Sequence, residues 1–239
     1  MTTALLLLTL AAGCAAQDDK AVDDALDAFK AAYKSTSEAD RVAAVNDLAK
    51  VHHAKTLARL ALLLASDGTT VRIAAAKGIA GFVEMKKPAA ATLSAAMPAN
   101  AKETTVHSAL YEALGKLEEP SSLPTIHRGF DEKETVVARA AILASGQVGS
   151  ASSIDLVIAL LTKLEKLQKS SGGGVDYTAP GVGGGTVTVR SDDSPVKRAQ
   201  ELIPAVNKAL NEITREANAS AETWSAWWSK NKATFKPLK

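Results

Sequence analysis

The segment Val71-Arg72-Ile73-Ala74-Ala75-Ala76-Lys77-Gly78-Ile79-Ala80 decides the fold, because the chain repeats it. Ungapped copies begin at Val106 and Val137, and an earlier, more divergent copy begins at Asp40. Alanine at the fourth and fifth places permits close approach of helices, and the apolar residue at the ninth place lies on the same helical face. The segment is therefore predicted to be a recurring helix that buries one face.

The copies begin at 40, 71, 106 and 137, so they are 31, 35 and 31 residues apart. This length accommodates two short antiparallel helices and two turns. One such unit has no core of its own, and stacking of neighbouring units buries the shared apolar face. Partner helices with their own apolar stripes lie between the copies, at Leu57, Leu60, Ala61 and Leu64, at Ala89, Leu93 and Met97, and at Ile154, Val157, Leu160, Leu161 and Leu164. The sequence predicts an all-α superhelix of helix pairs over residues 38–169.

Turn residues agree with these helix boundaries. Ser66-Asp67-Gly68 and Gly129-Phe130-Asp131 precede two of the repeated helices, and Pro120 and Pro124 interrupt a third connection. Asp67 and Asp131 are predicted to cap the helices that follow them.

Asp67, followed by Val71-Arg72 and Ala74-Ala75, resembles the bacterial HEAT-repeat family, including the short form shared with phycobilisome-lyase-like proteins. The resemblance covers residues 38–168 and implies a HEAT-like solenoid. In that family the aspartate and arginine form a ladder between repeats, which would give Arg72 a structural role. His107 and Ala138 occupy the place of Arg72 in later copies, and Arg139 is shifted by one residue.

The N-terminus is predicted to be an export signal, residues 1–16. An apolar run from Ala4 to Gly13 precedes Cys14, the only cysteine of the chain, and is too short to cross a bilayer as a helix. Small residues before Cys14 resemble the bacterial lipobox, which implies a lipid at Cys14 that attaches the protein to a membrane. We expect an exported protein of the periplasm, or an outer-membrane lipoprotein. Ordinary cleavage near Ala16 and a leader that is not exported are the alternatives.

Two further segments flank the repeats. Residues 17–37 are predicted to form an N-terminal capping helix, with Val22, Leu26, Phe29 and Tyr33 on its apolar face. Residues 170–193 form a Gly-rich insertion in which a continuous helix is not credible, because seven glycines lie between 172 and 185. Its alternating residues favour a β-hairpin and a disordered loop about equally.

Residues 194–239 are predicted to form a degenerate final repeat and a Trp-rich cap. Ser220 is a candidate helix cap, and Trp224, Trp227 and Trp228 share one helical face behind it. Burial as a structural cap is one interpretation of the three tryptophans, and an exposed carbohydrate or peptide platform is the other. This ending resembles that of exported HEAT-repeat lipoproteins of planctomycete-type bacteria.

No catalytic, metal-binding or cofactor-binding motif is recognisable. The chain contains no Gly-x-Ser-x-Gly or His-Glu-x-x-His sequence, its four histidines are scattered, and no cofactor is expected. A net charge of +2 gives no reason to expect nucleic acid as a partner. We therefore expect a protein that is not an enzyme.

The function predicted from these observations is a non-catalytic protein-interaction scaffold of the cell envelope. Stacked repeats present an extended surface to another protein, and Arg72, His107 and Arg139 are the candidate contact residues. A lyase-like or chaperone activity in the repeat groove, and carbohydrate or cell-wall binding through the tryptophans, are the alternatives.

Overall fold

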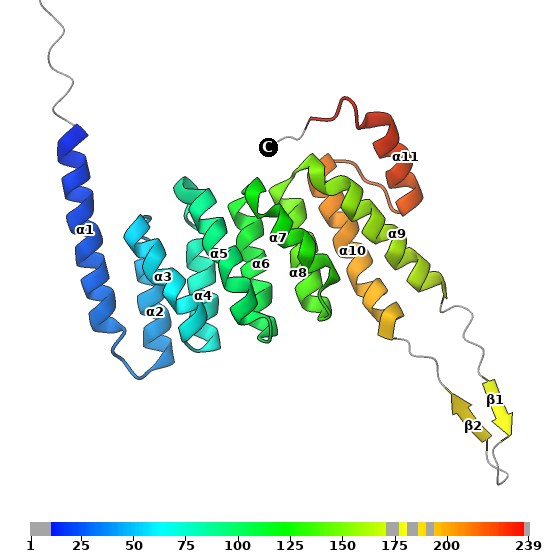
Figure 1. Cartoon of the computed structure of the whole chain (residues 1–239), viewed down its shortest axis with the longest axis horizontal. Coiled ribbons are helices and arrows are strands. Elements are labelled where there is room, and N and C mark those ends of the chain that lie inside the picture. The colour runs from blue at the N-terminus through cyan, green and yellow to red at the C-terminus, as the bar shows by residue number, and fades with distance from the viewer. Residues whose placement is uncertain (1–10, 171–176, 181–185, 190–193, 237–239) are drawn as a thin grey trace, which may run out of the picture. The chain divides into compact units, whose positions relative to one another are not determined.

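The computed structural model describes residues 11–170, 177–180, 186–189 and 194–236. The chain divides into two compact units, Met1–Leu117 and Glu118–Lys239. The regular elements of the described part are helices apart from one short two-stranded ladder, which confirms the predicted all-α class (Figure 1).

Unit 1 consists of helices that pack on both their sequence neighbour and the helix two places along the chain. Its elements are α1 (Ala11–Ala32), α2 (Glu38–Leu48), α3 (Ala54–Ser66), α4 (Thr69–Ile79), η1 (Val83–Met85), α5 (Lys86–Asn100) and α6 (Thr104–Leu117). Helices α2, α4 and α6 pack in succession, α3 lies against α4 and α5, and α5 lies against α6. Helix α1 covers α2 and α3 with its buried Val22 and Phe29.

Unit 2 has the same kind of packing. Its elements are η2 (Pro120–Ser122), α7 (Leu123–Arg128), η3 (Gly129–Asp131), α8 (Thr135–Val148), η4 (Ala151–Ser153), α9 (Ile154–Ser170), β1 (Tyr177–Pro180), β2 (Thr186–Val189), α10 (Ser194–Thr214) and α11 (Ala221–Asn231). Helix α7 pairs with α8, α10 packs along α8 and α9, and α11 lies against α9.

The four repeated segments of the sequence are the helices α2, α4, α6 and α8. Each helix begins two residues before the predicted start, at Glu38, Thr69, Thr104 and Thr135. The fifth place of the repeat is buried in all four helices, by Ala44, Ala75, Leu110 and Ala141. The repeat period therefore predicted the helices and their inward face correctly.

Two glycines allow helices to approach closely. A Cβ atom at Gly78 of α4 would lie 2.6 Å from the Cβ of Ala49, next to the end of α2. A Cβ atom at Gly146 of α8 would lie 2.7 Å from the Cα of Ala209 in α10. Since carbon atoms in contact normally lie about 3.5–4.0 Å apart, each glycine sets the spacing of its helix pair.

The Gly-rich insertion contains an antiparallel ladder, in which Tyr177 pairs with Val189 and Pro180 with Thr186. Of the two alternatives that the alternating residues left open, the ladder corresponds to the β-hairpin. The other residues of the insertion from 171 to 193 lie outside the described residues.

The predicted signal segment lies partly outside the described residues, which begin at Ala11. Cys14 lies within α1, which continues from Ala11 to Ala32 across the predicted boundary at residue 16. No helix among the described residues combines the length and the apolar character needed to cross a bilayer.

Candidate partner-binding surface

Asp67 joins three segments of unit 1 instead of capping α4. Its carboxylate lies 3.4 Å from the guanidinium of Arg41 in α2 and accepts a hydrogen bond from the hydroxyl of Tyr33. The N-cap position of α4 is held by Gly68, which has no side chain to cap the helix. The predicted capping role of Asp67 is therefore wrong. The cap of α8 likewise is Glu134 and not Asp131, which ends η3.

Arg72 makes an equivalent contact one repeat later. Its Nη1 donates to Oδ1 of Asn100 at 2.9 Å. Asn100 is fully buried, and its Nδ2 donates to the carbonyl oxygens of Leu64 and Ala96, both at 2.9 Å. Arg41 and Arg72 occupy the same place of the repeat. Each arginine therefore binds a polar side chain that lies further along the chain.

Only one of the three predicted contact residues is fully exposed. Arg72 is half-buried and held by Asn100. His107 is only 3% exposed, and its ring centroid lies 5.2 Å from that of Tyr111. Arg139 is exposed on α8 in unit 2. The expectation of a surface side chain is wrong for His107, because its ring packs beside Tyr111 in the core.

The tryptophans attach α11 to the rest of unit 2. Trp224 and Trp228 are buried, and their indole N–H groups donate to Asn207 Oδ1 at 3.0 Å and to Asp155 Oδ1 at 2.8 Å. Trp227 is half-buried between Trp228 and Phe235. Of the three rings, only Trp227 is thus partly open to solvent. Ser220 caps α11 as predicted, in a capping box with Thr223.

Asp155 holds this attachment from α9. Besides the indole of Trp228, its carboxylate accepts a hydrogen bond from Lys232 Nζ at 2.8 Å. The hydrogen bonds from Lys232 and Trp228 hold the pKa of Asp155 below its usual value.

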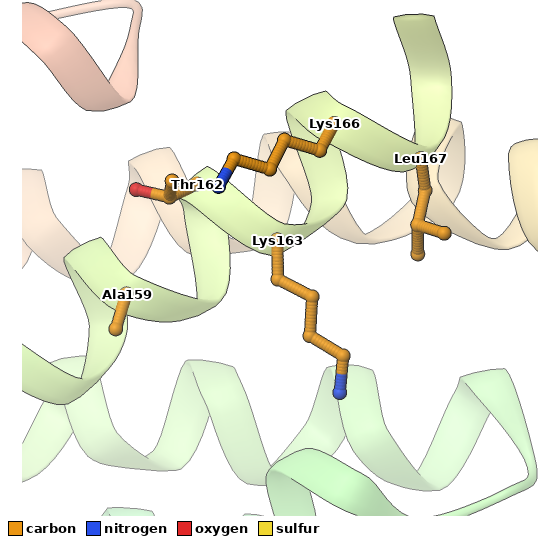
Figure 2. Close-up of a pocket in the computed structure, with 5 residues that line it drawn as sticks. All are labelled: Ala159, Thr162, Lys163, Lys166 and Leu167. Carbon is orange, nitrogen blue, oxygen red and sulfur yellow. The ribbon is translucent and has the colours of Figure 1, made fainter. Parts of the chain in front are cut away.

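A hollow of about 450 Å³ lies on the exposed face of α9. Its lining residues are Ala159, Thr162, Lys163, Lys166 and Leu167. We call this set the α9 stripe. The spacing i, i+3, i+4, i+7, i+8 places all five on one helical face, the arrangement by which amphipathic helices meet a packing partner. Figure 2 shows Lys163 and Leu167 pointing to the same side of α9, while Lys166 extends back along the helix toward Thr162.

Lysines dominate the charge of this face and of the turn that follows it, where Lys169 lines the adjoining hollow. Lys163, Lys166 and Lys169 are all exposed. Lys163 Nζ lies 3.6 Å from the carboxylate of Asp131, and within the described residues Lys166 and Lys169 have no ion-pair partner. A second hollow of about 300 Å³ adjoins the stripe and shares Thr162 and Lys166 with it. The surface is therefore basic, with apolar side chains between the charges.

No protein-family model and no curated protein matches this chain.

A histidine–serine pair in unit 2 is not suited to nucleophilic catalysis. His127 Nε2 lies 2.9 Å from Ser153 Oγ, but Ser153 is fully buried, so a substrate has no access to its hydroxyl. Burial lowers the pKa of His127. Nowhere in the described residues do three or more histidine, cysteine or acidic side chains gather as metal ligands would.

The α9 stripe was not predicted from the sequence, because the apolar periodicity of this helix indicates only its buried face. Its signal was present, since lysines at 163, 166 and 169 recur every three residues. A row of lysines is usually just a solvated helix face. What distinguishes this row is the hollow that Lys163 and Lys166 help to line.

Proposed function

We propose that the chain is a non-catalytic, HEAT-like repeat scaffold that binds another protein through the α9 stripe. The observation that carries the proposal is the stripe itself, a set of residues on one face of α9 that line a hollow and of which Ala159, Lys163 and Lys166 are exposed. Helix-in-groove recognition uses faces of this kind.

The HEAT-like character is supported by the two arginine contacts. Arg41 reaches Asp67 and Arg72 reaches Asn100, so the same position of successive repeats binds a polar side chain further along the chain. A ladder of this kind belongs to the family that the sequence resembles. Arg72 then stabilises the stack, and Arg139 remains a candidate contact residue.

Site-specific photo-cross-linking in intact cells tests the proposal. A photoreactive amino acid at Ala159, an exposed residue of the stripe, is expected to form a reproducible cross-link to one protein. The matched control is Ala58, which is exposed on α3 of unit 1. Absence of a cross-linked protein at Ala159, or the same product from both positions, would contradict the proposal.

We also propose that the protein is exported and carries a lipid at Cys14. The apolar run before Cys14 and the small residues next to it support this assignment. The mass of the mature protein should correspond to a chain that begins at Cys14 with a diacylglyceryl group. A mature chain beginning near Gln17 would indicate ordinary signal cleavage, and an intact Met1 would exclude export by this route.

A further inference from the structure

We propose that the α9 stripe binds an acidic amphipathic helix of the partner protein, in the place beside α9 that the short helix α7 leaves open. This inference rests on the proposed function and adds the chemistry of the partner.

The place beside α9 follows from the packing of the other helices. In unit 1, α3 and α5 pair with α4 and α6 and also pack against each other. In unit 2, α9 packs against α11 in the same way. The helix that precedes α9 in this role is α7, which pairs with α8. Together with the 3-10 turns η2 and η3 at its two ends, α7 forms one continuous segment, Pro120–Asp131, of 3, 6 and 3 residues, against 17 residues in α9. This segment is shorter than α9 and ends beside the middle of it.

A single ion pair shows where the preceding segment ends beside α9. Asp131, the last residue of η3, meets Lys163 near the middle of α9. From Lys163 the helix continues to Ser170, which is about 10 Å or two turns further. Lys166, Leu167 and Lys169 lie on these two turns. A docked helix of two to three turns would take up the space.

The charges of α9 specify an acidic partner. Lys163 and Lys166 lie about 60° apart around α9, so carboxylates spaced by three or four residues on a second helix can reach both ammonium groups. Lys169 adds positive charge at the edge of this face. Glu165, the acidic residue among them, accepts the N–H of Ala221 at 2.8 Å and serves the start of α11. Apolar contact would come from Leu167 and from Leu156, which is 47% exposed one turn before Ala159.

The same chain already contains one contact between an acidic and a basic helix. Helix α1 packs mainly on α2 and also touches α3, and its Val22 and Phe29 are buried. Asp23 of α1 lies 2.8 Å from Lys55 of α3, and the guanidinium of Arg59 lies 5.2 Å from the centre of the Phe29 ring. An acidic helix with an apolar stripe thus meets the basic side chains of a second helix within unit 1, and we assign a partner of this kind to α9.

An anionic membrane surface is the competing source of negative charge. The stripe borders a hollow, and a hollow suits the protruding side chains of a helix better than a flat lipid headgroup layer. Vesicle binding is therefore one outcome that the experiment must separate from peptide binding.

The test uses the full chain and a stapled helical peptide with glutamates at every third or fourth position and leucines between them. We expect saturable binding by fluorescence anisotropy, weakened at least about tenfold when Lys163, Lys166 and Lys169 are all changed to Glu. The control variant changes the exposed Lys77, Lys87 and Lys102 of unit 1 to Glu, which alters the net charge equally, and should bind within about twofold of the native chain. Asp131→Asn should strengthen binding by about two- to fivefold, because Lys163 then loses its own carboxylate.

Several outcomes would overturn the inference. These are no saturable binding of the acidic peptide to the native chain, equal weakening in both lysine variants, and binding of phosphatidylglycerol vesicles that is lost on changing the α9 lysines. Sequencing of the segment cross-linked to position 159 separates this inference from the proposed function. If the cross-linked segment is neutral or basic, the proposal of an acidic helix is refuted and the proposed scaffold function is not affected. If no protein is cross-linked, the scaffold function itself is refuted.

Discussion

Replacement of Gly78 by alanine tests whether the spacing of α2 and α4 depends on a missing methyl group. The added Cβ would lie 2.6 Å from the Cβ of Ala49, about 1 Å closer than carbon atoms normally approach. The next atoms, in Leu60 and in the backbone of Ala49, are 3.9 and 4.0 Å away, which is ordinary contact. The conflict is therefore confined to one pair of methyl groups.

Two opposing effects set the magnitude. Alanine in place of glycine inside a helix stabilises it by about 1 kcal/mol. Overpacking of a close contact costs about 1–3 kcal/mol, so Gly78→Ala should destabilise by up to about 2 kcal/mol. Ala49→Gly alone should cost about 1 kcal/mol through the loss of a buried methyl group. The double variant moves the methyl across the contact, and should be about 1–3 kcal/mol more stable than the sum of the single effects.

Urea unfolding followed by far-ultraviolet circular dichroism measures all four proteins of this cycle. Lys77→Ala, on the exposed side of the same helix, is the control and should change the free energy of unfolding by less than about 0.5 kcal/mol. If Gly78→Ala stabilises the protein by about 1 kcal/mol, helix propensity alone accounts for the change in the free energy of unfolding, and the steric argument fails. Additive single effects would also refute it.

Three other perturbations have expected outcomes. Asn100→Ala leaves Arg72 and the carbonyl of Leu64 without their buried partner, and should lower the free energy of unfolding by about 2–3 kcal/mol in a urea titration, more than Arg72→Ala does. The pKa of His127 is lowered in the folded state, so below its ordinary value of 6.5 the unfolded chain binds a proton first. The urea midpoint of unit 2 should therefore fall as the pH drops from neutral through that value, and this fall should be smaller in His127→Gln. The pKa of Asp155 is also lowered, so its stabilising effect is present above 3.8 and is lost as the pH falls through the folded-state pKa. Tryptophan fluorescence should report loosening of α11 in that acidic range, and Asp155→Asn should show no such pH dependence.

The helices could be predicted because their determinants are local. The repeated segment after Val71 carries its own apolar face, and its period fixes where α2, α4, α6 and α8 begin. Pro120 and Pro124 also indicate a broken connection, where the structure has η2 and the short helix α7. Periodicity and turn residues act within a few positions of the chain, so the sequence is sufficient to predict the helices and their boundaries.

Contacts between distant residues could not be predicted in the same way. Aspartate commonly caps helices, which is why Asp67 was predicted to do so. Asp67 binds Arg41 and Tyr33 instead, because the packing of α1 and α2 brings those side chains to it. Trp228 meets Asp155, 73 positions away, and no local pattern connects them. The residues of the α9 stripe are visible in the sequence, but the hollow next to them is a property of the folded unit.

The length of the segment that contains α7 also bears on how the proposed scaffold would position a partner. Similar repeats offer a ligand several equivalent binding positions. Within unit 2, the segment Pro120–Asp131, of 3, 6 and 3 residues, precedes a helix of 17 residues, and this difference in length breaks the equivalence. A partner that docks there is held in one register along the chain.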